Sequence, residues 1–113
     1  MLYDKDIREP LFEFLEETYG KVRFLEEQVM GQSRADIVMV VPDALYGIEI
    51  KSDADSYVRL ERQIQDYDLY YDYNYVVVGT KHGANISITN SSAGFSNYNA
   101  GMIDCSRLNI DVR

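Results

Sequence analysis

The chain has 113 residues, of which 46% are hydrophobic and 27% are charged, and its formal net charge is −8. This length corresponds to a single domain, residues 1–113, and the composition is that of a globular protein with a core of its own, which excludes disorder throughout. The acidic balance excludes nonspecific attraction to nucleic acid through a basic surface.

Cellular location follows from what the sequence lacks. No apolar run approaches the roughly 20 residues needed to cross a bilayer, and the first ten residues, MLYDKDIREP, lack the pattern of a secretion signal. The single cysteine, Cys105, has no partner for an internal disulfide, which fits a reducing compartment. We therefore expect a cytoplasmic protein with no membrane partner.

The N-terminal residues predict a helix. It begins with a cap at Asp4 or Asp6 and ends at about Tyr19, before Gly20. Helical spacing predicts this buried face: Ile7, Leu11, Phe14, Leu15 and Thr18. Acidic residues occupy the other face: Glu9, Glu13, Glu16 and Glu17.

Three strands are expected next. Apolar and charged residues alternate over 21–25, which predicts the first strand, and this strand could extend to Val29. A turn is predicted at residues 31–33. Two apolar, β-branched runs follow at 37–41 and 45–50, and Pro42-Asp43-Ala44 separates them. This pattern predicts a β-hairpin.

Charged residues flank that hairpin. Asp36 opens its first strand, while Glu49 and Lys51 close its second strand and point to the same face. Antiparallel pairing brings Asp36 beside them. Charges in a sheet are costly unless they are paired or bind a cation, and carboxylates suit Mg²⁺ or Mn²⁺. The pattern indicates a phosphodiester site; an ordinary solvent-facing pair of Glu49 and Lys51 is the open alternative.

A loop at 52–56 and a second helix, reaching about Tyr71, are predicted after the hairpin. Its buried face should contain Tyr57, Leu60, Ile64, Tyr67 and Tyr71. Gln63 and Arg59 lie at the edge of this face, where we expect them to look toward the predicted site. The alternatives are a surface amide for Gln63 and a core aromatic for Tyr67.

The remaining elements are shorter. The apolar run 74–80 predicts a buried strand, parallel to a neighbour after a helical crossover. His82 is expected to be a surface residue. Residues 83–100, rich in Asn, Ser and Gly, predict a loop with a short strand around Ile86 and Ile88, and 102–103 and 108–112 are expected as final strands.

Several of these residues occur together in a known group of proteins. Asp36, a turn and Glu49-Ile50-Lys51 resemble the signature of the PD-(D/E)xK nuclease superfamily, and 63–67 resemble the Gln-x-x-x-Tyr element of its RecB-type members. The string GIEIKSDADSYVRLERQIQDY, followed by YVVVGTKH, is similar to small bacterial and phage members, some described as DNA-repair-like. Glu26-Glu27, Gly31 and Arg34 fit the same pattern.

The resemblance covers about residues 6–82. Beyond it, relatives carry an aromatic step, often with tryptophan, whereas this chain has a polar stretch and no tryptophan. The resemblance implies an α/β, restriction-endonuclease-like core: a mixed central sheet flanked by helices, in the order α-β-β-β-α-β, with short C-terminal strands.

The same resemblance implies a Mg²⁺- or Mn²⁺-dependent deoxyribonuclease, with DNA as partner. Its catalytic residues would be Asp36, Glu49, Lys51 and Gln63, with Arg34, Arg59 and Tyr67 in contact with DNA. Besides Asp36 and Glu49, a further glutamate joins the metal in several branches. The candidates for this role are Glu9, Glu26 and Glu27, although Glu9 projects away from the buried face.

Two other functions remain open from the sequence. One is a catalytically silent binding protein that serves as an accessory subunit of a DNA-processing complex. The other is an acidic, phage-type inhibitor, suggested by the net charge. A homodimer through residues 70–75 or a free sheet edge is also compatible with the sequence.

Overall fold

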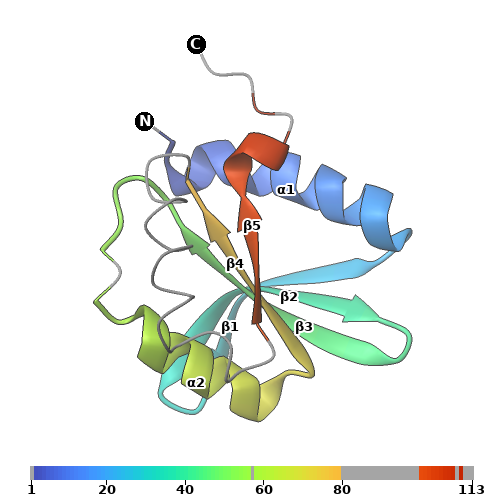
Figure 1. Cartoon of the computed structure of the whole chain (residues 1–113). Coiled ribbons are helices and arrows are strands. Elements are labelled where there is room, and N and C mark those ends of the chain that lie inside the picture. The colour runs from blue at the N-terminus through green and yellow to red at the C-terminus, as the bar shows by residue number, and fades with distance from the viewer. Residues whose placement is uncertain (1, 57, 80–99, 109, 111–113) are drawn as a thin grey trace.

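A five-stranded mixed sheet lies between two helices in the computed structural model, which describes residues 2–56, 58–79, 100–108 and 110 (Figure 1). Helix α1 (Asp4–Tyr19) covers one face and helix α2 (Leu60–Tyr70) covers the other. The predicted α/β class and element order are confirmed. Within the described residues, neither helix has the length and apolar character that spanning a membrane requires.

The sheet contains β1 (Arg23–Met30), β2 (Ser33–Val41), β3 (Ala44–Lys51), β4 (Tyr73–Val78) and β5 (Ala100–Asp104), in that spatial order. The first three strands are antiparallel neighbours, while β3, β4 and β5 are parallel. The predicted hairpin is therefore confirmed, with a turn of only Pro42 and Asp43 because Ala44 already pairs with Val41. The predicted parallel crossover through α2 is confirmed too.

Two expectations for α1 are corrected. Its N-cap is Tyr3, not Asp4 or Asp6, and the Asp6 carboxylate instead accepts a 2.9 Å hydrogen bond from the Tyr3 N–H. Thr18 does not join the buried face; it is exposed, and its hydroxyl donates to the carbonyl of Phe14 at 2.9 Å. A threonine can satisfy its hydroxyl in this way on the outside of a helix, so spacing alone overstated its burial.

The C-terminal half follows the predictions in part. Met102 and Ile103 lie in β5, and a short 3-10 helix follows at Cys105–Arg107. The strand predicted over 108–112 is absent at the two residues of that stretch that the structure describes, Leu108 and Ile110. Several predictions concern positions outside the described residues: Tyr57, Thr80, His82, Ile86 and Ile88.

The core has two layers, one on each face of the sheet. On one face, Ile7, Leu11 and Leu15 of α1 pack with a cluster that contains Ile37, Met39, Ile48, Ile50, Val77 and Ile103. On the other face, the buried residues of α2 and the strands include Leu60, Ile64, Tyr67, Ala35, Val38, Val76 and Val78. Each fully buried aliphatic side chain contributes about 1.5–3 kcal/mol. The sheet is therefore packed on both of its faces, by α1 on one side and by α2 on the other.

Candidate active site

The three charged residues of the hairpin converge on the face of the sheet that α2 covers. Ile37 pairs with Ile48, so Asp36 lies beside Glu49 across the two strands. The two carboxyl groups influence each other's pKa, and Glu49 Oε2 lies 3.5 Å from Lys51 Nζ. Glu49 is 4% exposed and Lys51 is 5% exposed, so the solvent-facing pair considered from the sequence is not formed.

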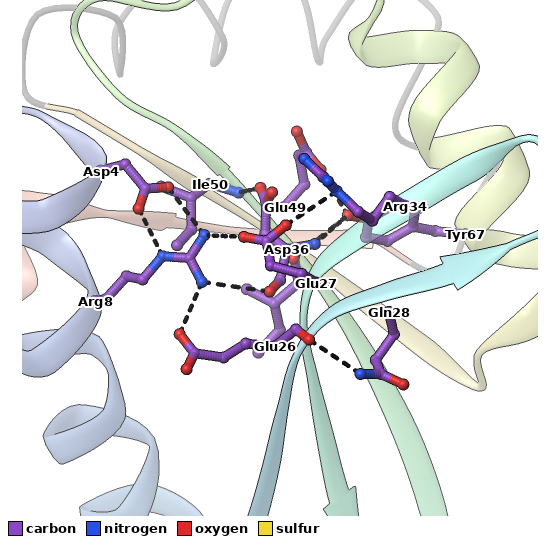
Figure 2. A network of polar contacts seen from close by, with 11 residues as sticks. Asp4, Arg8, Glu26, Glu27, Gln28, Arg34, Asp36, Glu49, Ile50 and Tyr67 are labelled. Atoms are coloured by element: carbon purple, nitrogen blue, oxygen red, sulfur yellow. Dashed lines mark hydrogen bonds and ion pairs between the residues drawn. The ribbon is translucent and has the colours of Figure 1, made fainter.

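Asp36 occupies the point where the backbone ladder between β2 and β3 ends. Beyond the pair of Ile37 and Ile48, the main-chain N–H of Ile50 donates to Asp36 Oδ2 at 2.8 Å (Figure 2). The carboxylate thus takes the place of the missing backbone acceptor, which a buried N–H requires. This bond orients Asp36 toward Glu49.

Tyr67 reaches the pair from α2. Its hydroxyl donates to Glu49 Oε1 at 2.5 Å and accepts from the Asp36 N–H at 3.2 Å. Its side chain is 0% exposed and is not among the residues that line the adjacent pocket. The predicted contact of Tyr67 with nucleic acid is therefore corrected: this residue is a core aromatic that positions Glu49.

Burial dominates the electrostatics of the carboxyl pair. The pKa of Glu49 is raised to about 7, first by burial and then by the charge of Asp36, while the Tyr67 hydrogen bond and the charge of Lys51 oppose the shift. Burial also raises the pKa of Asp36, against the lowering effect of the Ile50 N–H. Each of two neighbouring carboxyl groups disfavours the charged form of the other, and a bound cation would relieve this repulsion.

A pocket of about 830 Å³ opens above the pair. Its lining contains six of the residues that the sequence analysis selected: Arg34, Asp36, Glu49, Lys51, Arg59 and Gln63. The Oε1 atom of Gln63 is buried and has no hydrogen-bond partner within the described part of the chain. A buried acceptor without a donor is uncommon, and its position in this wall suits a water or a ligand that donates to it.

The donor chemistry at the base of the pocket fits Mg²⁺ or Mn²⁺. These ions bind through one or two carboxylates and complete their coordination with waters and phosphate oxygens, so Asp36 and Glu49 could hold one. No group of three His, Cys, Asp or Glu side chains suited to a metal occurs among the described residues. Neither Glu9 nor Glu27 joins Asp36 and Glu49 as a third carboxylate for the metal. Glu9 is exposed on α1, and Glu27 contacts Arg8 and Arg34.

Arg8 is a residue of this region that the sequence analysis missed. Its guanidinium donates to Asp4 at 2.6 Å, to Glu26 at 2.9 Å and to Glu27 at 2.7 Å, and it lies 3.4 Å from the carbonyl of Asp36 (Figure 2). The four-residue spacing from Asp4 was a signal for one of these pairs. The other contacts depend on how α1 docks on β1.

Glu27 is also unusual in its backbone. It has φ +55°, a left-handed conformation that residues other than glycine seldom adopt. It stands opposite Asp36, between the pairs that Glu26 and Gln28 form with β2. Its carboxylate is held by Arg8 and, at 3.1 Å, by Arg34 Nε. Two arginines thus hold this carboxylate, and its negative charge contributes to raising the pKa of the neighbouring Asp36.

Comparison with models of known protein families finds a match to one family. Residues 2–99 match the model of the family described as bacteriophage P4 protein cII. No match was found among curated proteins or among solved structures. Because the family model spans most of the 113 residues, the chain belongs to the bacteriophage P4 protein cII family.

Proposed function

We propose that this cII-family protein hydrolyses phosphodiester bonds of DNA with the help of Mg²⁺ or Mn²⁺. The observation that carries the proposal is the convergence of Asp36, Glu49 and Lys51 at the base of a pocket whose walls contain Gln63 and three arginines. Nearly complete burial of charged residues is costly, and a role in binding a cation and a phosphate accounts for it. The resemblance to PD-(D/E)xK nucleases, and with it a restriction-endonuclease-like core, supports the same chemistry.

In this proposal Asp36 and Glu49 hold the cation. The ion would polarise the scissile phosphate and lower the pKa of a bound water. The protein fixes both carboxylates before substrate arrives: the Ile50 N–H holds Asp36, and the Tyr67 hydroxyl holds Glu49. A site that is already oriented reduces the reorganisation needed during reaction.

Lys51 and Gln63 then act on the reacting atoms. The oxygen of a water forms a bond to phosphorus, one phosphorus–oxygen ester bond breaks, and the proton of the water ends on the hydroxyl of the leaving strand. Lys51 stabilises the negative charge that grows on the phosphate, and the unpaired Oε1 of Gln63 accepts a hydrogen bond from the water.

Cleavage assays of the full chain test this proposal. Labelled single-stranded, double-stranded and branched DNA are incubated with Mg²⁺ or Mn²⁺, and Asp36→Asn and Lys51→Met should each reduce cleavage by about a hundredfold or more. Asp43→Asn is the matched control, because Asp43 is exposed in the hairpin turn and outside the pocket. Circular dichroism verifies that each variant is folded. Absence of cleavage of all three DNA forms by the unaltered protein would refute the proposal.

A second candidate function rests on one observation. Among the described residues, only the carboxylates of Asp36 and Glu49 meet at the base of the pocket, and Arg8 and Arg34 engage the nearest alternative, Glu27. A pair that keeps a proton instead of a cation would leave a silent DNA-binding subunit of a larger complex. Calorimetric titration with Mn²⁺ separates the two functions: heat of binding that is lost in Asp36→Asn supports the nuclease, and DNA binding without it supports the silent subunit.

A further inference from the structure

Two arginines at the start of α2 stand on the wall of the pocket. Arg59 is the N-cap of the helix and Arg62 lies three residues later, and both side chains are exposed. Neither guanidinium forms an ion pair within the described residues, although the chain has 19 acidic residues against 11 basic ones. In a protein with this excess of carboxylates, two unpaired arginines beside one pocket indicate a site kept open for an external anion.

The backbone around these arginines favours the same kind of ligand. No side chain caps the N-terminus of α2, so its first N–H groups lack the usual acceptor. Residues three apart lie on neighbouring positions of a helix, which allows Arg59 and Arg62 to act on one group. Arginine binds phosphate through paired hydrogen bonds, and the positive end of the helix dipole adds to that attraction.

The opposite side of the pocket region has the reverse charge. Asp4 lines the pocket from α1, and its carboxylate belongs to a cluster in which Asp4, Glu26 and Glu27 surround Arg8, while Glu27 also pairs with Arg34 (Figure 2). Helices α1 and α2 lie on opposite faces of the sheet (Figure 1). At α2 the pocket is bordered by Arg59 and Arg62 together with Asp66, whose carboxylate accepts a hydrogen bond from the Ser33 hydroxyl, whereas at α1 it is bordered by negative charge.

The burial of the reactive groups limits which form of DNA can reach them. Glu49 and Lys51 are 4% and 5% exposed, so a phosphate must descend below the rim to reach them. An unpaired strand can bend into such a site. A duplex is much stiffer, with a persistence length of about 50 nm, so it resists a bend of this kind.

We propose that the pocket takes one unpaired strand of DNA, with a phosphate next to the scissile one bound by Arg59 and Arg62. The second backbone of a duplex would face the acidic cluster at α1, where its phosphates are repelled. This inference rests on the proposed nuclease function, because it orders the substrate around Asp36, Glu49 and Lys51.

Binding measurements on the full chain test the inference without requiring cleavage. Fluorescence anisotropy compares a labelled single strand with the duplex of the same sequence, with Ca²⁺ as the oxygen-binding cation. The single strand should bind about tenfold more tightly than the duplex. The double variant Arg59→Gln/Arg62→Gln should weaken single-strand binding about tenfold and reduce the slope of log K against log salt by about 0.7, the value for one phosphate contact on a single strand.

Arg23→Gln is the control for loss of arginine charge elsewhere, because it removes one positive charge at the start of β1, outside the pocket lining. It should change single-strand affinity by less than about twofold. Duplex binding equal to or tighter than single-strand binding would overturn the inference, and so would an unchanged affinity and salt slope in the double variant.

The cleavage assay separates failure of this inference from failure of the nuclease proposal. Arginine-dependent binding of the single strand without any cleavage in Mg²⁺ or Mn²⁺ refutes the nuclease and retains the strand site. Cleavage with an unaltered KM in the double variant refutes the strand site and retains the nuclease.

Discussion

The hydroxyl of Tyr67 donates a 2.5 Å hydrogen bond to Glu49 Oε1, linking helix α2 to the strand that carries the buried carboxylate. The Tyr67 hydroxyl oxygen also accepts a hydrogen bond from the main-chain N–H of Asp36 at 3.2 Å. One buried side chain thus contacts both members of the carboxyl pair. Because the bond stabilises the charged form of Glu49, Tyr67 makes this carboxylate more available to a cation than its burial alone would allow.

Replacing Tyr67 by phenylalanine should therefore change the pH dependence of the site. The bond that opposes the burial of Glu49 is lost in Tyr67→Phe, and we expect the pKa of Glu49 to rise above its value of about 7. The pH midpoint of Mn²⁺ binding, measured by calorimetry, should move upward. Tyr71→Phe, which removes a tyrosine hydroxyl at the C-cap of the same helix, is the control. An unmoved midpoint in Tyr67→Phe would show that the hydroxyl does not act on Glu49.

Glu49 should also make the metal-free protein sensitive to pH. Its pKa is raised from 4.5 to about 7, so in this window the folded protein keeps a proton that the unfolded chain releases. The free energy of unfolding should then fall as the pH rises from about 4.5 to about 7. Glu49→Gln cannot ionise, which should remove this decline and leave the variant about 1–3 kcal/mol more stable than the parent above about pH 7.

Urea denaturation in a metal chelator, repeated across this pH range, measures the effect. The same variant should lose Mn²⁺ binding, so stability and function change in opposite directions. Glu61→Gln, on the exposed side of α2, provides a control that removes a carboxylate without affecting the site. A Glu49→Gln variant less stable than the parent at alkaline pH would contradict the conclusion that the ionised Glu49 carboxylate destabilises the folded, metal-free protein.

Arg8 is expected to stabilise the docking of α1 on the sheet. Its side chain is 18% exposed and pairs with three carboxylates, which would repel one another without it. Since those carboxylates are 41–51% exposed and partly screened, Arg8→Met should cost about 1–2 kcal/mol of unfolding free energy, and less at high salt. Chemical denaturation at two salt concentrations, with Arg23→Met as control, measures this. Equal losses in both variants would mean that the cluster contributes nothing specific.

Gly47 leaves the space that Tyr67 occupies. A methyl group there would lie 2.8 Å from Tyr67 Cδ2 and still closer to Tyr71 Cδ2, so the rings would have to move. Gly47→Ala should destabilise the protein by about 1–3 kcal/mol and reduce Mn²⁺ binding by displacing Tyr67 from Glu49. Gly20→Ala is a useful comparison, because Gly20 has φ +82° and no neighbouring atoms within 4 Å. It should reduce stability without altering Mn²⁺ binding.

The sequence was sufficient for the hairpin and for the meeting of Asp36, Glu49 and Lys51. A short turn fixes the register of two antiparallel strands, and alternation then decides which side chains share a face. Both rules act over a few residues, so they can be read directly from the order of amino acids. The helical period likewise placed Gln63 and Arg59 on the flank of α2 that lines the pocket.

Only the tertiary structure decided the partners of these residues. Arg8 meets Glu26 and Glu27 across 18 and 19 residues of sequence, and the Tyr67 hydroxyl meets Glu49 across 18. No local period specifies such contacts, because they depend on the angle and position at which each helix packs on the sheet. For the same reason the predicted role of Tyr67 changed from binding nucleic acid to holding a carboxylate inside the core.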